Sequence, residues 1–126
     1  MVEEGVVEIP VDTSAANLAT PVVPRLFIGP FLNARSRAWL RRHGVTHVLN
    51  ATAQAPCTHQ PELEYLRVPV DDNPRVKIEN HFEASNAFIG GALAVGGTVL
   101  VHCHMGKSRS ATLIAAYLMA ERGHGF

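Results

Sequence analysis

The residues with the clearest chemical potential lie in the stretch VLVHCHMGKSRSAT, residues 99 to 112. Cys103, one of two cysteines in the chain, follows an apolar run there, and Arg109 comes six residues later. An apolar strand, a tight loop and a helix would aim several backbone N–H groups at one point, where the helix dipole adds positive charge. Gly106 has no side chain to obstruct the convergence of these amides. The stretch therefore predicts an anion cradle with a cysteine at its base.

Such a cradle suits nucleophilic attack on phosphorus. The guanidinium of Arg109 offers a planar fork of donors that matches two oxygens of a phosphate. Free thiols have a pKa near 8.5, which falls to roughly 3.5–7.5 at helix N-termini or beside cations, so we expect Cys103 to be a thiolate nucleophile. Ser110 could donate a hydrogen bond to the sulfur and make it a better leaving group in a second step.

A leaving alkoxide or phenoxide also needs a proton donor, which must later act as the base for a hydrolytic water. The segment VDDNP places Asp71 and Asp72 after an apolar strand, at the strand end where α/β sheets carry their sites. The residue pattern by itself leaves both carboxyl groups as candidates.

The rest of the chain predicts the elements that would position this site. Strands alternate with helices, which indicates an α/β three-layer sandwich with a mainly parallel central sheet flanked by helices. We expect Asn33 to be the N-cap of the first helix and Gly44 to follow its end. The expected strands cover 26–28, 45–51, 63–70 and 98–101, and the expected helices cover 33–43, 78–95 and 109–122.

Length and composition predict one domain. Residues 1–20 read as a flexible N-terminal arm and 21–126 as the folded, catalytic domain. The chain has eleven basic residues (lysine and arginine together) and eleven acidic residues (aspartate and glutamate together). Its net charge therefore gives no reason to expect a nucleic-acid or membrane partner. Two cysteines and no secretory signal favour a reducing compartment, which is the cytoplasm or the nucleus. The oligomeric state stays open.

Two further features have alternative interpretations. The neighbours His102, Cys103 and His104 suggest a metal site at first sight, but adjacent residues of a strand point to opposite faces, so we expect neither a metal nor another cofactor. The four arginines of the first helix form either a basic patch or an ordinary solvated face. They are Arg35, Arg37, Arg41 and Arg42.

The motif HCHMGKSRS resembles the signature of cysteine-dependent protein phosphatases: histidine, cysteine, five residues, then arginine and serine or threonine. Two other segments are similar to the dual-specificity subgroup, namely RLFIGPFLNARSRAWLRRHGVTHVLNAT and YLRVPVDDNPRVKIENHF. The resemblance covers about residues 24–122.

The resemblance implies a role for each matching residue. Cys103 is the nucleophile, Arg109 the phosphate clamp, Ser110 assists thiolate departure, and His102 helps to lower the pKa of the thiol. The family's acid usually follows a proline, an apolar residue and an acidic residue, which selects Asp72 over Asp71 as the general acid. The phosphate-binding cradle consists of the backbone of His104, Met105, Gly106, Lys107, Ser108 and Arg109.

The same resemblance implies a protein phosphatase that hydrolyses phosphotyrosine and phosphoserine or phosphothreonine through a cysteinyl-phosphate intermediate. The expected partner is a phosphorylated protein. Lys107 and the arginines of 35–42 keep a phosphoinositide or RNA 5′-phosphate substrate as an alternative. An inactive phosphate-binding module is the other alternative, because the chain stops at Phe126, where the family continues with another turn and helix.

Three smaller points also come from the resemblance. Met105 stands where the subgroup generally has alanine, and Asn33 matches a position near the margin of the site, with a structural role at most. Some relatives pair their nucleophile with a second cysteine under oxidation, so Cys57 is either such a partner for Cys103 or a plain loop thiol.

Overall fold

The computed structural model describes residues 18–70, 77–103 and 108–122. Five strands form one sheet in the order β2-β3-β6-β4-β5. The strands are β2 (Thr20–Val23), β3 (Leu26–Pro30), β4 (His47–Asn50), β5 (Glu64–Arg67) and β6 (Val99–Cys103). The helices are α2 (Phe31–Ala34), α3 (Arg37–Arg42), α4 (Phe82–Ala94) and α5 (Ser108–Glu121), and a short 3-10 helix, η1 (Ile78–His81), leads into α4.

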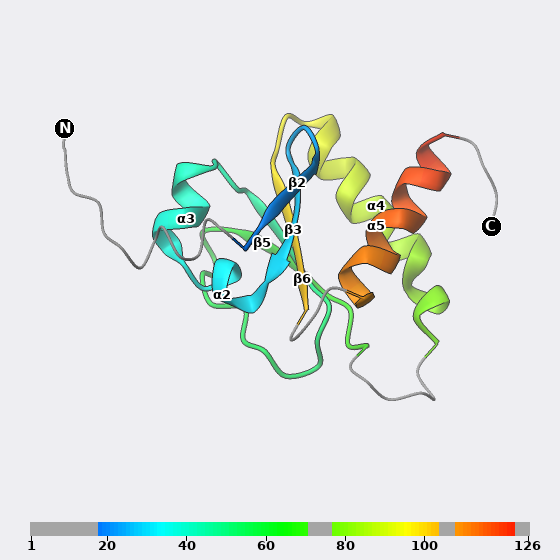
Figure 1. Cartoon of the computed structure of the whole chain (residues 1–126), viewed down its shortest axis with the longest axis horizontal. Helices are drawn as coiled ribbons and strands as arrows, with labels where there is room; N and C mark the ends of the chain where they lie inside the picture. The colour runs from blue at the N-terminus through cyan, green and yellow to red at the C-terminus, as the bar shows by residue number, and fades with distance from the viewer. Residues whose placement is uncertain (1–17, 71–76, 104–107, 123–126) are drawn as a thin grey trace.

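The elements form three layers, as the sequence predicted. Helices α2 and α3 lie on one side of the sheet, and α4 and α5 lie on the other (Figure 1). The pairs β3–β6, β6–β4 and β4–β5 are parallel, and β2 is the one strand of the described ranges that pairs antiparallel, with β3. The α/β sandwich with a mainly parallel sheet is thus confirmed.

Strand β6 is the centre of the sheet and is buried over its whole length. Its apolar sequence fits a strand that is covered on both faces. Leu100 packs with Trp39 and Val48 in the core under α3, whereas Val101 packs with Leu113 in the core under α4 and α5. Alternate residues of β6 therefore enter opposite cores, which fixes the direction in which each residue of the signature strand points.

The first predicted helix is in fact two. Asn33 was predicted to be its N-cap, and this was wrong, because Asn33 is fully buried inside the short helix α2. The cap of α3 is Ser36, whose Oγ accepts a hydrogen bond of 3.1 Å from the backbone N–H of Trp39. Gly44 follows α3 with a φ of 66°, a left-handed conformation that glycine adopts without strain, so the predicted end was right.

Three other details differ from the sequence-based expectation. Strand β2 was not predicted, because its sequence TPVV is short and contains a proline, as edge strands tolerate. Strand β5 ends at Arg67, although Val68 and Val70 beyond it are buried. Helix α4 continues through Gly90, where an added Cβ would lie 3.5 Å from Cε1 of Tyr117, an ordinary van der Waals distance, so Gly90 faces α5.

Within the described ranges, none of the helices has both the length and the apolar character that crossing a bilayer requires.

Candidate active site

Cys103 is the last residue of β6 and lies in register with Pro30 at the end of β3. Only 4% of its surface is exposed, and it belongs to the core cluster that includes Leu113 of α5. Strands β3, β4, β5 and β6 all run in the same direction, so their carboxyl ends meet at one edge of the sheet. The thiol therefore lies at the edge where parallel sheets place their ligand sites.

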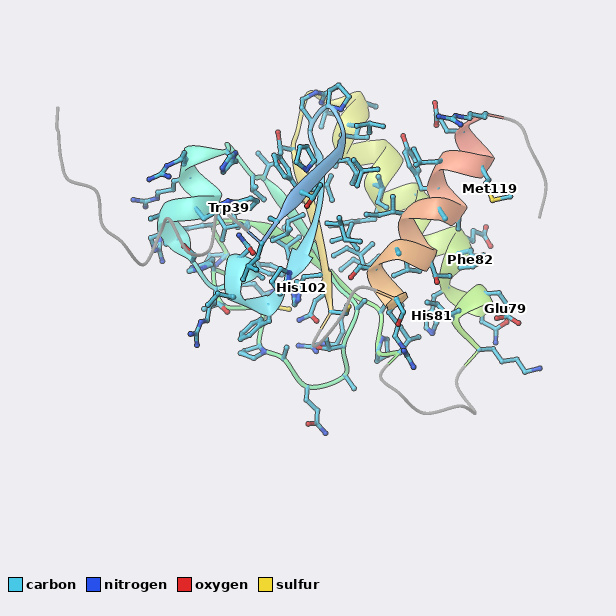
Figure 2. All side chains as sticks on the ribbon, viewed as in Figure 1. Trp39, Glu79, His81, Phe82, His102 and Met119 are labelled. Carbon is cyan, nitrogen blue, oxygen red and sulfur yellow. The ribbon has the colours of Figure 1, made fainter. Side chains whose placement is uncertain are left out.

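His102 lies in register between Gly29 of β3 and Asn50 of β4 and is fully buried. Figure 2 places it toward the end of β6, and its ring centroid is 5.7 Å from that of Phe31 in α2. The backbone N–H of Ala51 donates a hydrogen bond of 2.8 Å to the carbonyl oxygen of His102. These contacts fix the backbone directly before the cysteine.

The first turn of α5 carries the other described candidates. Arg109 is half-buried, and its Nη1 donates to Oγ of Ser108 at 3.3 Å. Ser110 is fully buried, and its Oγ has no hydrogen-bond partner among the described residues. A buried hydroxyl without a partner costs free energy, which makes Ser110 a candidate for contact with a group bound in the site.

The remaining predicted site residues lie outside the described residues. They are Asp72, its alternative Asp71, and the loop residues His104, Met105, Gly106 and Lys107. The chain before the two aspartates is described, and Val70 there belongs to the same core cluster as Cys103. The roles assigned to these side chains stay predictions.

A side-chain network that the sequence analysis missed builds the loop after β4. The amide of Asn50 is fully buried; its Nδ2 donates to Ala55 O at 2.8 Å, and its Oδ1 accepts from Thr52 N at 3.1 Å and from Thr52 Oγ1 at 2.7 Å. Arg67 of β5 donates to Thr52 O at 3.1 Å and to Ala55 O at 2.8 Å. Since Asn50 is in register with His102, this loop is held beside the signature strand.

The signal for the local part of this network was an asparagine at the end of an apolar strand, where a short amide can bond to the backbone two residues later. Cys57 sits on the same loop as a half-buried thiol, 3.6 Å from Nδ2 of Asn50 and 3.7 Å from Nη2 of Arg67. Cys57 and Cys103 are not joined by a disulfide in this structure. The described residues contain no group of three or more histidine, cysteine, aspartate or glutamate side chains that could hold a metal ion.

We expect Asn50→Ala to lower the free energy of unfolding by about 2–3 kcal/mol, because it leaves the buried partners of three hydrogen bonds unpaired. Urea denaturation measures this loss. Thr58→Ala, at an exposed position on the same loop, is the matched control and should leave the midpoint nearly unchanged. Equal effects of the two substitutions would show that the network does not hold the loop.

Comparison with known proteins agrees with this geometry. The family model described as "Dual specificity phosphatase, catalytic domain" matches residues 26–125. Mouse dual specificity phosphatase 28 is 42% identical over 103 residues, which are 82% of this chain and 63% of that protein. Mouse dual specificity protein phosphatase 15 is 37% identical over 110 residues, 87% of this chain and 46% of that protein. The chain thus spans about half the length of these relatives.

Solved structures show the same similarity. The crystal structure of human DUSP28 matches with a TM-score of 0.77 and 40% identity, covering 84% of this chain and 71% of that one. The crystal structure of human tyrosine phosphatase-like serine/threonine/tyrosine-interacting protein matches with a TM-score of 0.72 and 34% identity, covering 85% and 76%. The chain belongs to the family of dual specificity phosphatase catalytic domains.

Proposed function

We propose that this chain hydrolyses phosphate monoesters of tyrosine and of serine or threonine in proteins. The observation that carries the proposal is the position of Cys103, which ends the buried central strand just before the helix that contains Arg109 and Ser110. Membership of the dual specificity phosphatase family supports the same reaction class.

In the first step, the Cys103 thiolate attacks phosphorus, and a sulfur–phosphorus bond forms as the bond to the substrate oxygen breaks. Asp72 gives its proton to the departing oxygen. The guanidinium of Arg109 and the backbone amides of 104–109 bind the other phosphate oxygens and stabilise their charge in the transition state. Val70, which precedes both aspartates, packs in the same core cluster as Cys103, which supports an acid from this segment. The choice of Asp72 over Asp71 comes from the family pattern of proline, apolar residue, acidic residue and then the acid.

In the second step, water attacks the phosphorus of cysteinyl phosphate, and the Asp72 carboxylate accepts a proton from that water. The sulfur–phosphorus bond breaks, inorganic phosphate leaves, and the thiolate is restored. The hydroxyl of Ser110 stabilises the departing sulfur by donating a hydrogen bond. Its complete burial without a partner among the described residues is the support for this role.

Phosphate release from phosphotyrosine and phosphothreonine peptides of matched sequence tests the proposed function. We expect release from both kinds of peptide, and retention of activity in the presence of a chelator. Release from an inositol phospholipid or from RNA 5′-phosphate, with none from either peptide, would overturn the protein substrate. Saturable peptide binding without release would instead favour a binding role, as in the relative described as phosphatase-like and interacting.

We expect Ser110→Ala to slow the second step selectively, with kcat falling by about 10- to 100-fold. Because cysteinyl phosphate would then accumulate, the first product should appear in a burst, and KM should fall together with kcat. Stability should be unchanged, because the substitution removes a buried hydroxyl without a partner among the described residues. Stopped-flow release of p-nitrophenol from its phosphate ester measures the burst.

Thr112→Ala on the exposed side of α5 is the matched control, and it should show neither a burst nor a lower kcat. A loss of stability in Ser110→Ala without a burst would contradict the role given to this hydroxyl.

A further inference from the structure

A hollow of about 150 Å³ lies between α3 and the loop that joins β4 to β5. Its apolar part is formed by Leu40, Val45 and Leu63, and its charged part by Arg37, Arg41 and Glu62. We call it the α3 pocket. Helix α3 covers the face of the sheet opposite α4 and α5, so the α3 pocket is separate from the α5 side of the molecule (Figure 1).

Two guanidinium groups of the α3 pocket converge on one carboxylate. Nη1 of Arg37 donates a hydrogen bond to Oε1 of Glu62, and Nη2 of Arg41 lies 3.7 Å from Oε2 of the same carboxylate. All three side chains are about half exposed or more. Glu62 therefore marks a position where a carboxylate contacts two arginines. Because two guanidinium groups face one carboxylate, one positive charge is in excess. Exposed ion pairs of this kind are weak, so an incoming carboxylate can replace the internal one.

His59 forms the wall of the α3 pocket on the side of the β4–β5 loop. It is 7% exposed; its Nε2 lies 3.2 Å from Arg35 O, and its backbone N–H donates to the hydroxyl of Tyr65 at 2.9 Å. Burial raises the pKa of Tyr65. Because a carbonyl oxygen only accepts, Nε2 is the donor in this contact, and Nδ1 is buried without a partner among the described residues.

We propose that the α3 pocket binds an acidic peptide segment of a partner protein. A side-chain carboxylate of the segment would lie between Arg37 and Arg41, and a neighbouring aliphatic side chain would enter the apolar part. A cavity of this size holds a group as large as benzene. No Phe, Tyr or Trp lines the pocket, and its one imidazole, that of His59, is only 7% exposed, so the pocket offers little ring surface for stacking on a base, which disfavours RNA.

Charge complementarity supports an acidic partner. Residues 35–42 contain four arginines and no acidic residue, and Glu62 is the carboxylate that lines the pocket. The inference does not depend on catalysis, because none of the residues that line the α3 pocket is assigned a step in phosphate hydrolysis.

The test uses the full chain and a fluorescein-labelled, N-acetylated peptide in which one leucine is flanked by glutamates. We expect saturable binding by fluorescence anisotropy with a Kd below about 1 mM, and amide shift changes in NMR spectra at Leu40, His59 and Leu63. Peptides with glutamine in place of glutamate, or serine in place of leucine, should bind more weakly. Equal binding of octanoate and the peptide would show a small-molecule carboxylate site and overturn the peptide proposal.

Three variants make the test specific. Arg41→Gln should weaken binding by about threefold to fivefold, since it removes one contact to the carboxylate. Arg42→Gln removes the same charge from the same helix outside the pocket and should change the Kd much less. Glu62→Gln removes the internal competitor and should strengthen binding by a similar factor. Equal weakening by both arginine variants, weaker binding in Glu62→Gln, or no binding at 1 mM peptide would each refute the proposal.

Discussion

Replacing Cys103 by serine is expected to lower kcat/KM on the order of 10⁴-fold or more, because a hydroxyl in this position is a far poorer nucleophile than a thiolate. The substitution is nearly isosteric, and Cys103 is a buried neighbour of Leu113, so the fold should persist. The assay is p-nitrophenol release by the purified chain, with thermal unfolding as the check on folding. Substrate should still bind, since the cradle and Arg109 remain.

Cys57→Ser provides the matched control. It changes the only other cysteine of the chain, which lies on the loop after β4 and contacts Asn50 and Arg67 rather than the end of β6. We expect this variant to keep most of the activity. Residual activity in Cys103→Ser comparable to that of Cys57→Ser would contradict the assignment of the nucleophile.

Arg109→Lys should have the second largest effect, a loss of about 10²- to 10³-fold in kcat/KM. Lysine retains the positive charge but lacks the planar fork of donors that matches two phosphate oxygens. Arg109 lies one residue into α5 and is half-buried, so its side chain is constrained on the helix that follows Cys103. Steady-state kinetics, together with the inhibition constant of inorganic phosphate, measure the loss of transition-state and ground-state binding separately.

Arg122→Lys, beyond the other end of α5, tests whether any arginine replacement near this helix has an effect. It is exposed and should keep kcat/KM within about twofold of the wild type. A similar result for Arg109→Lys would show that the fork does not contribute to the reaction.

A segment of the fold could be predicted from the sequence where a clear pattern of apolar residues determines its structure. The apolar run before Cys103 predicted a central strand, and β6 is buried over its full length. The helix after Arg109 was predicted from its apolar side, and Leu113, Ile114 and Tyr117 are indeed buried. Burial on both faces leaves little freedom in such segments, so pattern and structure agree.

The missed features depend on contacts between segments that are distant in the sequence. Strand β2 exists because its backbone pairs with β3, which its own sequence does not reveal. Asn33 has the right type for an N-cap, but burial in α2 gives it another role, and Ser36 caps α3 instead. The Asn50–Arg67 network joins two strands over one loop, so the asparagine at the strand end indicates its local bonds but not the contribution of Arg67.

The central claim is that Cys103 becomes covalently phosphorylated during turnover. Rapid acid quench of the reaction with a phosphotyrosine peptide, followed by proteolysis and mass spectrometry, tests it most directly. We predict a phosphate adduct on the peptide that contains Cys103, none on the peptide that contains Cys57, and more adduct in Ser110→Ala. Continued turnover with no adduct on Cys103, or with phosphate on His102 or another residue, would contradict the account.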